Sequence, residues 1–234
     1  MKKYIILFIF VFISSSIVNS QIYSRVEANV SIKTKYDTGK GTLEMGKIYF
    51  DKNNKKLIYD FSFPNKETIA IFDTVISVVR KGVLIERQKI APLLQSTMFS
   101  IILNGNLSNY GMKNNLFYKA IKVEKDKGLV ITTWSMPGKT KKLGDIMVST
   151  KDKDLFGVVM FSPKGEIISK QIFSKYIVVA GLRFPTEITQ VIYQDKKEIY
   201  QVTTFKNILV NNQKNENFYN YNLPVQQSNG ILPK

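Results

Sequence analysis

The side chains best suited to catalysis in this 234-residue chain are carboxylates, because the sequence contains no histidine and no cysteine. This removes the usual general base, the thiol nucleophile and most zinc sites. Carboxylate pairs can still hydrolyse glycosidic bonds, so an enzyme acting on glycans or glycolipids is one alternative. Most candidate aspartates, however, occupy predicted turns or strand ends, where Asx caps are their ordinary use: Asp51, Asp60, Asp73, Asp145 and Asp195. No spacing singles out an acid–base pair, so we predict that the protein is not an enzyme and holds no metal ion or cofactor.

Residues 1–20 have the three-part build of a secretory signal. Lys2 and Lys3 precede an apolar stretch from Tyr4 to Ile13, and a Ser-rich end precedes Gln21. The apolar stretch is too short for a permanent membrane anchor, so a cleaved signal peptide is favoured over a retained anchor. Without cysteine there is no lipidation site and no disulfide framework. We expect a soluble, unlipidated mature chain with one domain over 21–224 and a disordered tail over 225–234.

The chain is strongly basic, with 34 Lys and Arg against 18 Asp and Glu, a formal net charge of +16. Such an excess favours anionic partners, either nucleic acid or a membrane surface. The signal peptide argues against nucleic acid. Because the lysines are dispersed along the chain, we interpret most of them as solvated strand faces.

An antiparallel meander is predicted between Gly41 and Phe72, where three alternating apolar and polar runs are separated by turn sequences. Side chains of one parity give this sheet an apolar face: Ile48, Phe50, Leu57, Tyr59, Phe61, Phe63, Ile69 and Ile71. Leu43 and Met45 have the opposite parity, so the strand must change face near Gly46. A residue without a Cβ tolerates a bulge there, and the bend would curl the sheet.

One amphipathic helix is predicted from Lys89 to Leu103, where apolar residues recur at spacings of three and four and Asn104-Gly105 provides a stop. Alternating strands precede it from Arg25 and follow it as far as Ile208, with a possible short closing strand at 218–224. We therefore expect a mainly β fold, a half-closed antiparallel barrel of about ten or eleven strands. A long meander has to close or half-close to satisfy its edges, and the helix is the natural plug for the open apolar side.

An interior that the helix plugs imperfectly would be a cleft suited to acyl chains. Each methylene transferred into it would contribute about 0.8 kcal/mol. The predicted lining comprises Ile48, Phe50, Leu57, Tyr59, Phe61, Ile69, Ile71 and Trp134 from strands, with Leu94, Met98 and Ile101 from the helix. The alternative is that these residues form only a dry core.

The run from Gly46 to Val79 resembles the central block of the periplasmic lipoprotein carriers, the LolA-like family. It has a Gly-led strand, a basic turn, an aromatic-rich strand ending in Pro, and two further strands. The helix with Pro92-Leu93-Leu94 is similar to the family's internal helix, and Asn217-Phe218 with Leu223-Pro224 is similar to its aromatic-then-Pro ending. The resemblance implies a helical lid over a half-barrel that carries lipoprotein acyl groups across the periplasm.

Two features depart from the carriers. Only Gln21 to Ser24 separate the predicted signal peptide from the first strand, where the carriers have a long helix. The carriers usually have Arg-Pro in the turn that helps hold the lid shut, whereas this turn offers Lys52 and Lys55 as the lid latch. A lysine lacks the planar fork of arginine.

The resemblance implies a monomeric periplasmic carrier or chaperone for lipoprotein acyl chains or free lipids. Its partners would be an inner-membrane donor and an outer-membrane acceptor, with transient membrane contact and no nucleic acid. The alternative is an envelope adaptor with a dry barrel core that binds an anionic surface.

Overall fold

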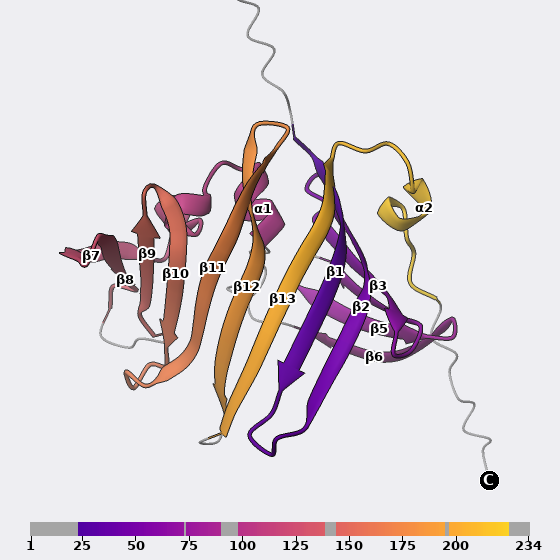
Figure 1. Cartoon of the computed structure of the whole chain (residues 1–234), viewed down its shortest axis with the longest axis horizontal. Coiled ribbons are helices and arrows are strands. Elements are labelled where there is room, and N and C mark those ends of the chain that lie inside the picture. The colour runs from indigo at the N-terminus through magenta and orange to yellow at the C-terminus, as the bar shows by residue number, and fades with distance from the viewer. Residues whose placement is uncertain (1–22, 73, 90–97, 139–143, 195–196, 225–234) are drawn as a thin grey trace, which may run out of the picture.

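The computed structural model describes residues 23–72, 74–89, 98–138, 144–194 and 197–224 (Figure 1). Within these residues thirteen strands form one antiparallel sheet. The strands are β1 (Arg25–Lys35), β2 (Gly41–Asp51), β3 (Lys56–Phe63), β4 (Glu67–Phe72), β5 (Val75–Arg80), β6 (Val83–Lys89), β7 (Lys119–Asp126), β8 (Leu129–Ser135), β9 (Ile146–Lys151), β10 (Asp154–Phe161), β11 (Ile167–Val179), β12 (Leu182–Gln194) and β13 (Lys197–Val210).

The sheet is an open meander, so the predicted half-closed barrel is confirmed. Its order is β6-β5-β4-β3-β2-β1-β13-β12-β11-β10-β9-β8-β7, which leaves β6 and β7 at the two edges. The prediction of ten or eleven strands was too low. Two-residue turns with left-handed φ, such as Lys81-Gly82 and Asp152-Lys153, join consecutive strands into short hairpins.

The sheet curves around α1 (Met98–Leu103), which lies behind β12 in Figure 1. The predicted helix start at Lys89 is wrong, because β6 continues through Lys89 and pairs with β5. The stretch 90–97 lies outside the described residues. The predicted stop is confirmed: Gly105 has φ +69°, its N–H donates to the Ile102 carbonyl, and the Asn106 N–H donates to the Ile101 carbonyl. This is a Schellman ending.

The predicted change of face at Gly46 is wrong, because β2 keeps an unbroken register with β1 and Leu43 and Met45 lie on the outer face. The bulge is instead in β3, where Ser62 is the extra residue. The β2–β3 register shifts between Met45 and Gly46. A Cβ at Gly46 would lie 2.2 Å from the Asp60 carbonyl oxygen. Only glycine fits this close approach of two strands.

Two apolar clusters lie on the concave face. The cluster under α1 contains Val26, Ala28, Val30, Ile48, Phe50, Leu57, Phe61, Phe99, Ile102, Leu103, Phe184, Phe205 and Ile208. The second contains Met112, Tyr118, Ile146, Val148, Leu155, Val158 and Phe173. Met98, Leu107 and Ile188 pack against both clusters, so the apolar surface is continuous along the sheet.

A third cluster lies on the outer face, where α2 (Glu216–Tyr219) crosses β2 and β3 (Figure 1). Phe218 stacks on Tyr49 with ring centroids 4.1 Å apart. The expected closing strand at 218–224 is therefore wrong. Because β1 already pairs with both β2 and β13, no free edge remains beside it for another strand, and the C-terminal segment packs across the sheet instead.

No helix among the described residues is both long and apolar enough to cross a membrane.

Candidate functional site

The concave face under α1 brings together most of the predicted lining residues. Ile48, Phe50, Leu57 and Phe61 are 0–3% exposed. Half-buried side chains pack against the same cluster: Tyr59, Ile69, Ile71 and Met98. The parity argument therefore places these side chains correctly on one face. Whether they bind an acyl chain stays a prediction.

The helix α1 fills the space over this face with side chains that sequence reasoning missed. The Phe99 ring lies 6.1 Å from the Phe50 ring and 5.3 Å from the Phe205 ring, measured between centroids. Phe99, Ile102 and Leu103 follow the spacing i, i+3, i+4, which is the signal that could have identified them. In this conformation α1 occupies the volume that a ligand would need.

The remaining predicted lining residues do not belong to the cluster under α1 as the structure describes it. Ile101 is 4% exposed and belongs to neither concave cluster; its Cγ1 lies 3.7 Å from where a Cβ of Gly111 would be, so it faces the loop after α1. Leu94 lies outside the described residues. Trp134 packs against the second cluster.

Trp134 also lines a hollow of about 420 Å³ between the β8–β9 part of the sheet and the 3₁₀ helix η3 (Leu107–Asn109). The other lining residues are Ser108, Asn109, Thr132, Val148, Thr150 and Lys153. The indole Nε1 of Trp134 is buried without a hydrogen-bond partner in the described part of the chain. This hollow is a polar opening next to the apolar interior.

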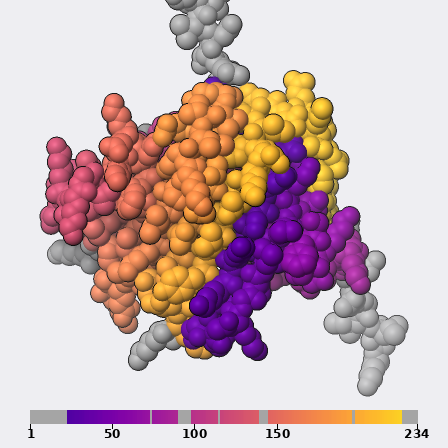
Figure 2. Space-filling model, viewed as in Figure 1, coloured from indigo at the N-terminus to yellow at the C-terminus, as the bar shows by residue number. Residues whose placement is uncertain are grey.

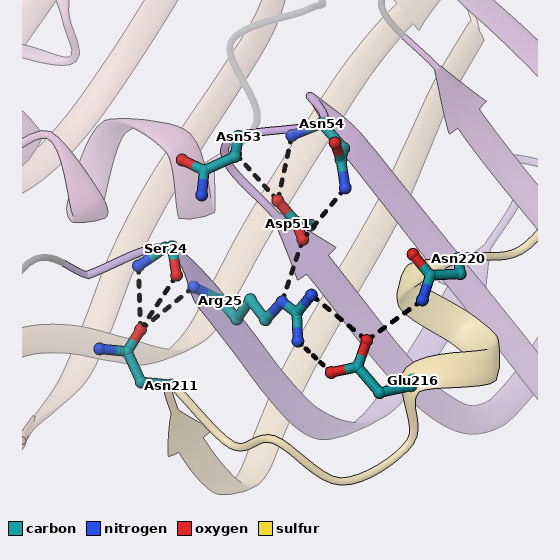
Figure 3. Close-up of polar contacts among 8 residues, drawn as sticks. All are labelled: Ser24, Arg25, Asp51, Asn53, Asn54, Asn211, Glu216 and Asn220. Atoms are coloured by element: carbon teal, nitrogen blue, oxygen red, sulfur yellow. Dashed lines mark hydrogen bonds and ion pairs between the residues drawn. The ribbon is translucent and has the colours of Figure 1, made fainter.

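The turn that should hold the lid latch is organised by Asp51 instead of by lysine side chains (Figure 3). Asp51 Oδ1 accepts hydrogen bonds from the backbone N–H groups of Asn53 and Asn54, at 2.9 and 3.0 Å. Its Oδ2 accepts one from Arg25 Nε at 3.0 Å. Lys52 contributes its backbone N–H to the Ser24 carbonyl, and Lys55 is exposed with φ +48°. The latch role of Lys52 and Lys55 stays a prediction.

Arg25 joins this turn to the C-terminal segment. Its Nη1 lies 2.5 Å from Glu216 Oε1, and its guanidinium lies 4.4 Å from the centre of the Tyr219 ring (Figure 3). The hydrogen bond to Glu216 is the largest of the contacts that raise the pKa of Arg25. Arg25 therefore fastens α2 to the outer face of β1 and β2.

The titratable groups of the concave face favour their neutral forms. Burial raises the pKa of Tyr59 and of Tyr110 to about 12, so both hydroxyls are protonated at neutral pH. Burial, and then repulsion from Glu67, raise the pKa of Glu44. In the part of the chain that the structure describes, no three acidic side chains gather as a metal site.

A groove of about 720 Å³ lies on the opposite, outer face of β13, β1, β2 and β3, the side that faces the viewer in Figure 2. Leu43 and Met45 form an apolar part of the groove's wall. Positive charge in the groove comes from Lys33, Lys47 and Lys206. Lys47 lies 3.8 Å from Glu27, and Asp60 also lines the groove, so the charge is partly compensated.

The chain is similar to three solved structures. A LolA superfamily protein from Nitrosomonas europaea is 12% identical, with a TM-score of 0.58 over 84% of this chain and 90% of that one. A DUF1329 family protein from Desulfovibrio piger is 12% identical, with a TM-score of 0.50 over 86% and 91%. A putative outer membrane lipoprotein-sorting protein domain from Vibrio parahaemolyticus is 12% identical, with a TM-score of 0.49 over 84% and 89%.

No protein-family model matches the sequence. No curated protein matches it either. At 12% identity the likeness to solved structures defines the fold alone. The chain has the LolA-like fold, an open antiparallel half-barrel with an internal helix, as its sequence predicts.

Proposed function

We propose that this protein binds acyl chains of lipoproteins or free lipids on the concave face of the sheet and carries them across the periplasm toward the outer membrane. The observation that carries the proposal is the position of α1, whose apolar side chains fill the concave face of a sheet that does not close. An acyl chain would take the place of these side chains when α1 moves away. No bond is made or broken, and a tighter-binding acceptor would drive release.

The energies of this exchange are compatible with binding. Moving α1 away exposes Phe99, Ile102 and Leu103, at a cost of roughly 1.5–3 kcal/mol for each side chain. A sixteen-carbon acyl chain gains roughly 11 kcal/mol when its methylenes leave water, at about 0.8 kcal/mol each. One long chain is therefore enough to compete with the helix. The described part of α1 is six residues long, too short to be a stable helix without its packing.

The test is titration of the purified protein with an environment-sensitive fluorescent palmitoyl probe. Phe99→Ala removes the ring that competes with the ligand, so we expect tighter probe binding than in the wild type, by about tenfold. Phe63→Ala is the matched control, because Phe63 is 46% exposed at the end of β3. It should leave the affinity unchanged. Folded wild-type and Phe99→Ala proteins that both fail to bind the probe would overturn the proposal.

The outer groove favours one second candidate, an adaptor with a dry core that binds an anionic surface. Lys33, Lys47 and Lys206 line that groove, and the concave clusters are closely packed. Such a protein would associate with vesicles of anionic phospholipid in a salt-sensitive manner and extract no lipid from them. Lipid extraction that persists at high salt would exclude it.

A further inference from the structure

A row of polar side chains crosses the concave face below the apolar cluster. Gln171 pairs with Gln190, Gln190 with Gln201, and Gln201 with Thr34 on four neighbouring strands. Side chains of paired residues lie on the same face of an antiparallel sheet. We call Gln171, Gln190, Gln201 and Thr34 the glutamine row.

The strand period places this row on the concave side. Side chains two positions apart on a strand lie on the same face. Phe173, Ile188 and Ile32 lie two positions from Gln171, Gln190 and Thr34, respectively, and they pack in the concave clusters. Tyr110, from the loop that follows α1, donates a hydrogen bond to Gln171 Oε1 at 3.2 Å. The row therefore lies roughly 13 Å from the level of Val30 and Phe205, a distance that four residues of strand span.

The row keeps unused hydrogen-bonding groups. Gln201 Nε2 donates to Thr34 Oγ1 at 3.3 Å, and Gln190 Nε2 donates to Ser169 Oγ at 3.1 Å. The Oε1 atoms of Gln190 and Gln201 accept no hydrogen bond from the described residues, and both side chains are only half-buried. A ligand group with N–H or O–H donors can use them.

The charge beside the row selects against anions. Glu44 pairs with Ile32, on the same face and one level closer to α1. Glu67 forms an ion pair with Arg80, whereas Glu44 has no ion pair within the described segments. An anionic head group beside Glu44 would meet like charge in a partly buried place, where repulsion is weakly screened.

We propose that the glutamine row is a head-group subsite that binds the uncharged amide or glycerol hydroxyl next to an acyl chain and discriminates against carboxylate and phosphate head groups. This inference rests on the proposed function, because it needs the acyl chain to lie under α1. The shared chemistry is a neutral hydrogen-bond donor. It can come from a neutral lipid or from an acylated peptide.

The experiment measures displacement of the fluorescent palmitoyl probe at pH 8 by four competitors with the same acyl chain. 1-Monopalmitoylglycerol and N-palmitoylglycinamide are neutral and distinguish the two sources, whereas palmitate and palmitoyl lysophosphatidylglycerol are anionic. Two hydrogen bonds to neutral groups predict a preference of about tenfold for at least one neutral competitor over both anions.

Variants assign the preference to residues. Gln190→Leu/Gln201→Leu keeps the side-chain size and should reduce the preference to less than about twofold without loss of probe binding. The matched control is Thr189→Leu/Val202→Leu, because this pair lies on the same two strands and faces the other side. It should keep the preference. Glu44→Gln should strengthen palmitate binding by about threefold or more and leave 1-monopalmitoylglycerol unchanged.

An equal affinity of the wild type for neutral and anionic competitors overturns the head-group subsite and leaves the proposed function standing. A tenfold preference that survives Gln190→Leu/Gln201→Leu also overturns it. A folded wild type that binds no acyl probe overturns both proposals.

Discussion

The buried hydroxyls of Tyr219 and Tyr118 differ in whether they form a hydrogen bond with the described residues. Tyr219 is 1% exposed, and its hydroxyl has no hydrogen-bond partner in the described part of the chain. Burial raises its pKa, so the unpaired group stays protonated. Tyr118 is also buried, at 4% exposed, but its hydroxyl donates to the Gly144 carbonyl at 2.9 Å.

We therefore expect opposite effects from the same substitution. Tyr219→Phe should raise the free energy of unfolding by up to about 1 kcal/mol, because it removes an unsatisfied buried group. Tyr118→Phe should lower it by about 1 kcal/mol, because the Gly144 carbonyl loses its donor. Urea unfolding measures both. A loss in Tyr219→Phe as large as in Tyr118→Phe would mean that the Tyr219 hydroxyl has a partner.

Glu44 predicts a dependence of stability on pH. Because its pKa is raised in the folded state, the folded protein holds the Glu44 proton at a higher pH than the unfolded chain does. The stabilisation from this proton is complete below the unfolded pKa and is lost as the pH rises through the folded pKa. Glu44→Gln should therefore stabilise the protein at pH 7 relative to wild type and have no such effect at pH 3. Equal effects at both pH values would contradict this account.

At the scale of elements, two cations contact the C-terminal segment: Lys56 Nζ donates to the Tyr221 carbonyl, and Arg25 binds Glu216. Arg25 lies between the buried carboxylate of Asp51, whose side chain is 3% exposed, and Glu216 on α2, whose side chain is 50% exposed (Figure 3). Removal of Arg25 leaves the Asp51 charge buried without its cation, whereas removal of the Glu216 charge leaves the buried pair intact.

Arg25→Leu should accordingly lower the free energy of unfolding by about 3 kcal/mol. Glu216→Gln should change it by less than about 1 kcal/mol. Chemical denaturation compares the two variants, and hydrogen exchange of the Phe218 and Tyr219 amides reports whether α2 loosens in Arg25→Leu. Losses of similar size in both variants would show that the exposed Arg25–Glu216 pair, and not the buried Arg25–Asp51 pair, accounts for the lost stability.

The elements also show what the sequence can predict. The parity of Ile48 and Phe50 correctly identifies the buried face, whereas the reversed parity before Gly46 wrongly predicts a change of face, because Leu43 and Met45 lie in the outer groove. The outer cluster was not predictable in this way. Tyr49, Ile58 and Ala70 alternate into the face that the pattern marks as solvated, and only the distant α2 buries them. Their parity alone gives no sign of that cover.

For the whole molecule, the curved open sheet and the helix that covers it can be predicted from the sequence. A long meander has to half-close because of its edges, and its apolar face has to be covered by another element. Most of the strand order follows from the turns between consecutive strands. The exception is the pairing of the first strand, β1, with the last strand, β13, in the middle of the sheet. The candidate site is less predictable. Parity identifies the sheet residues, but the aromatic packing of Phe99 with Phe50 and Phe205 depends on contacts between distant segments.

The central claim is that an acyl chain lies on the concave face in place of the α1 side chains. The direct measurement is photo-crosslinking with 1-monopalmitoylglycerol that carries a mid-chain diazirine, mapped by mass spectrometry at residue resolution. We predict labels on concave residues such as Phe50 and Phe61 and on α1, all reduced by unlabelled 1-monopalmitoylglycerol. Competable labels confined to Leu43 and Met45 in the outer groove, or no competable label at all, would contradict the account.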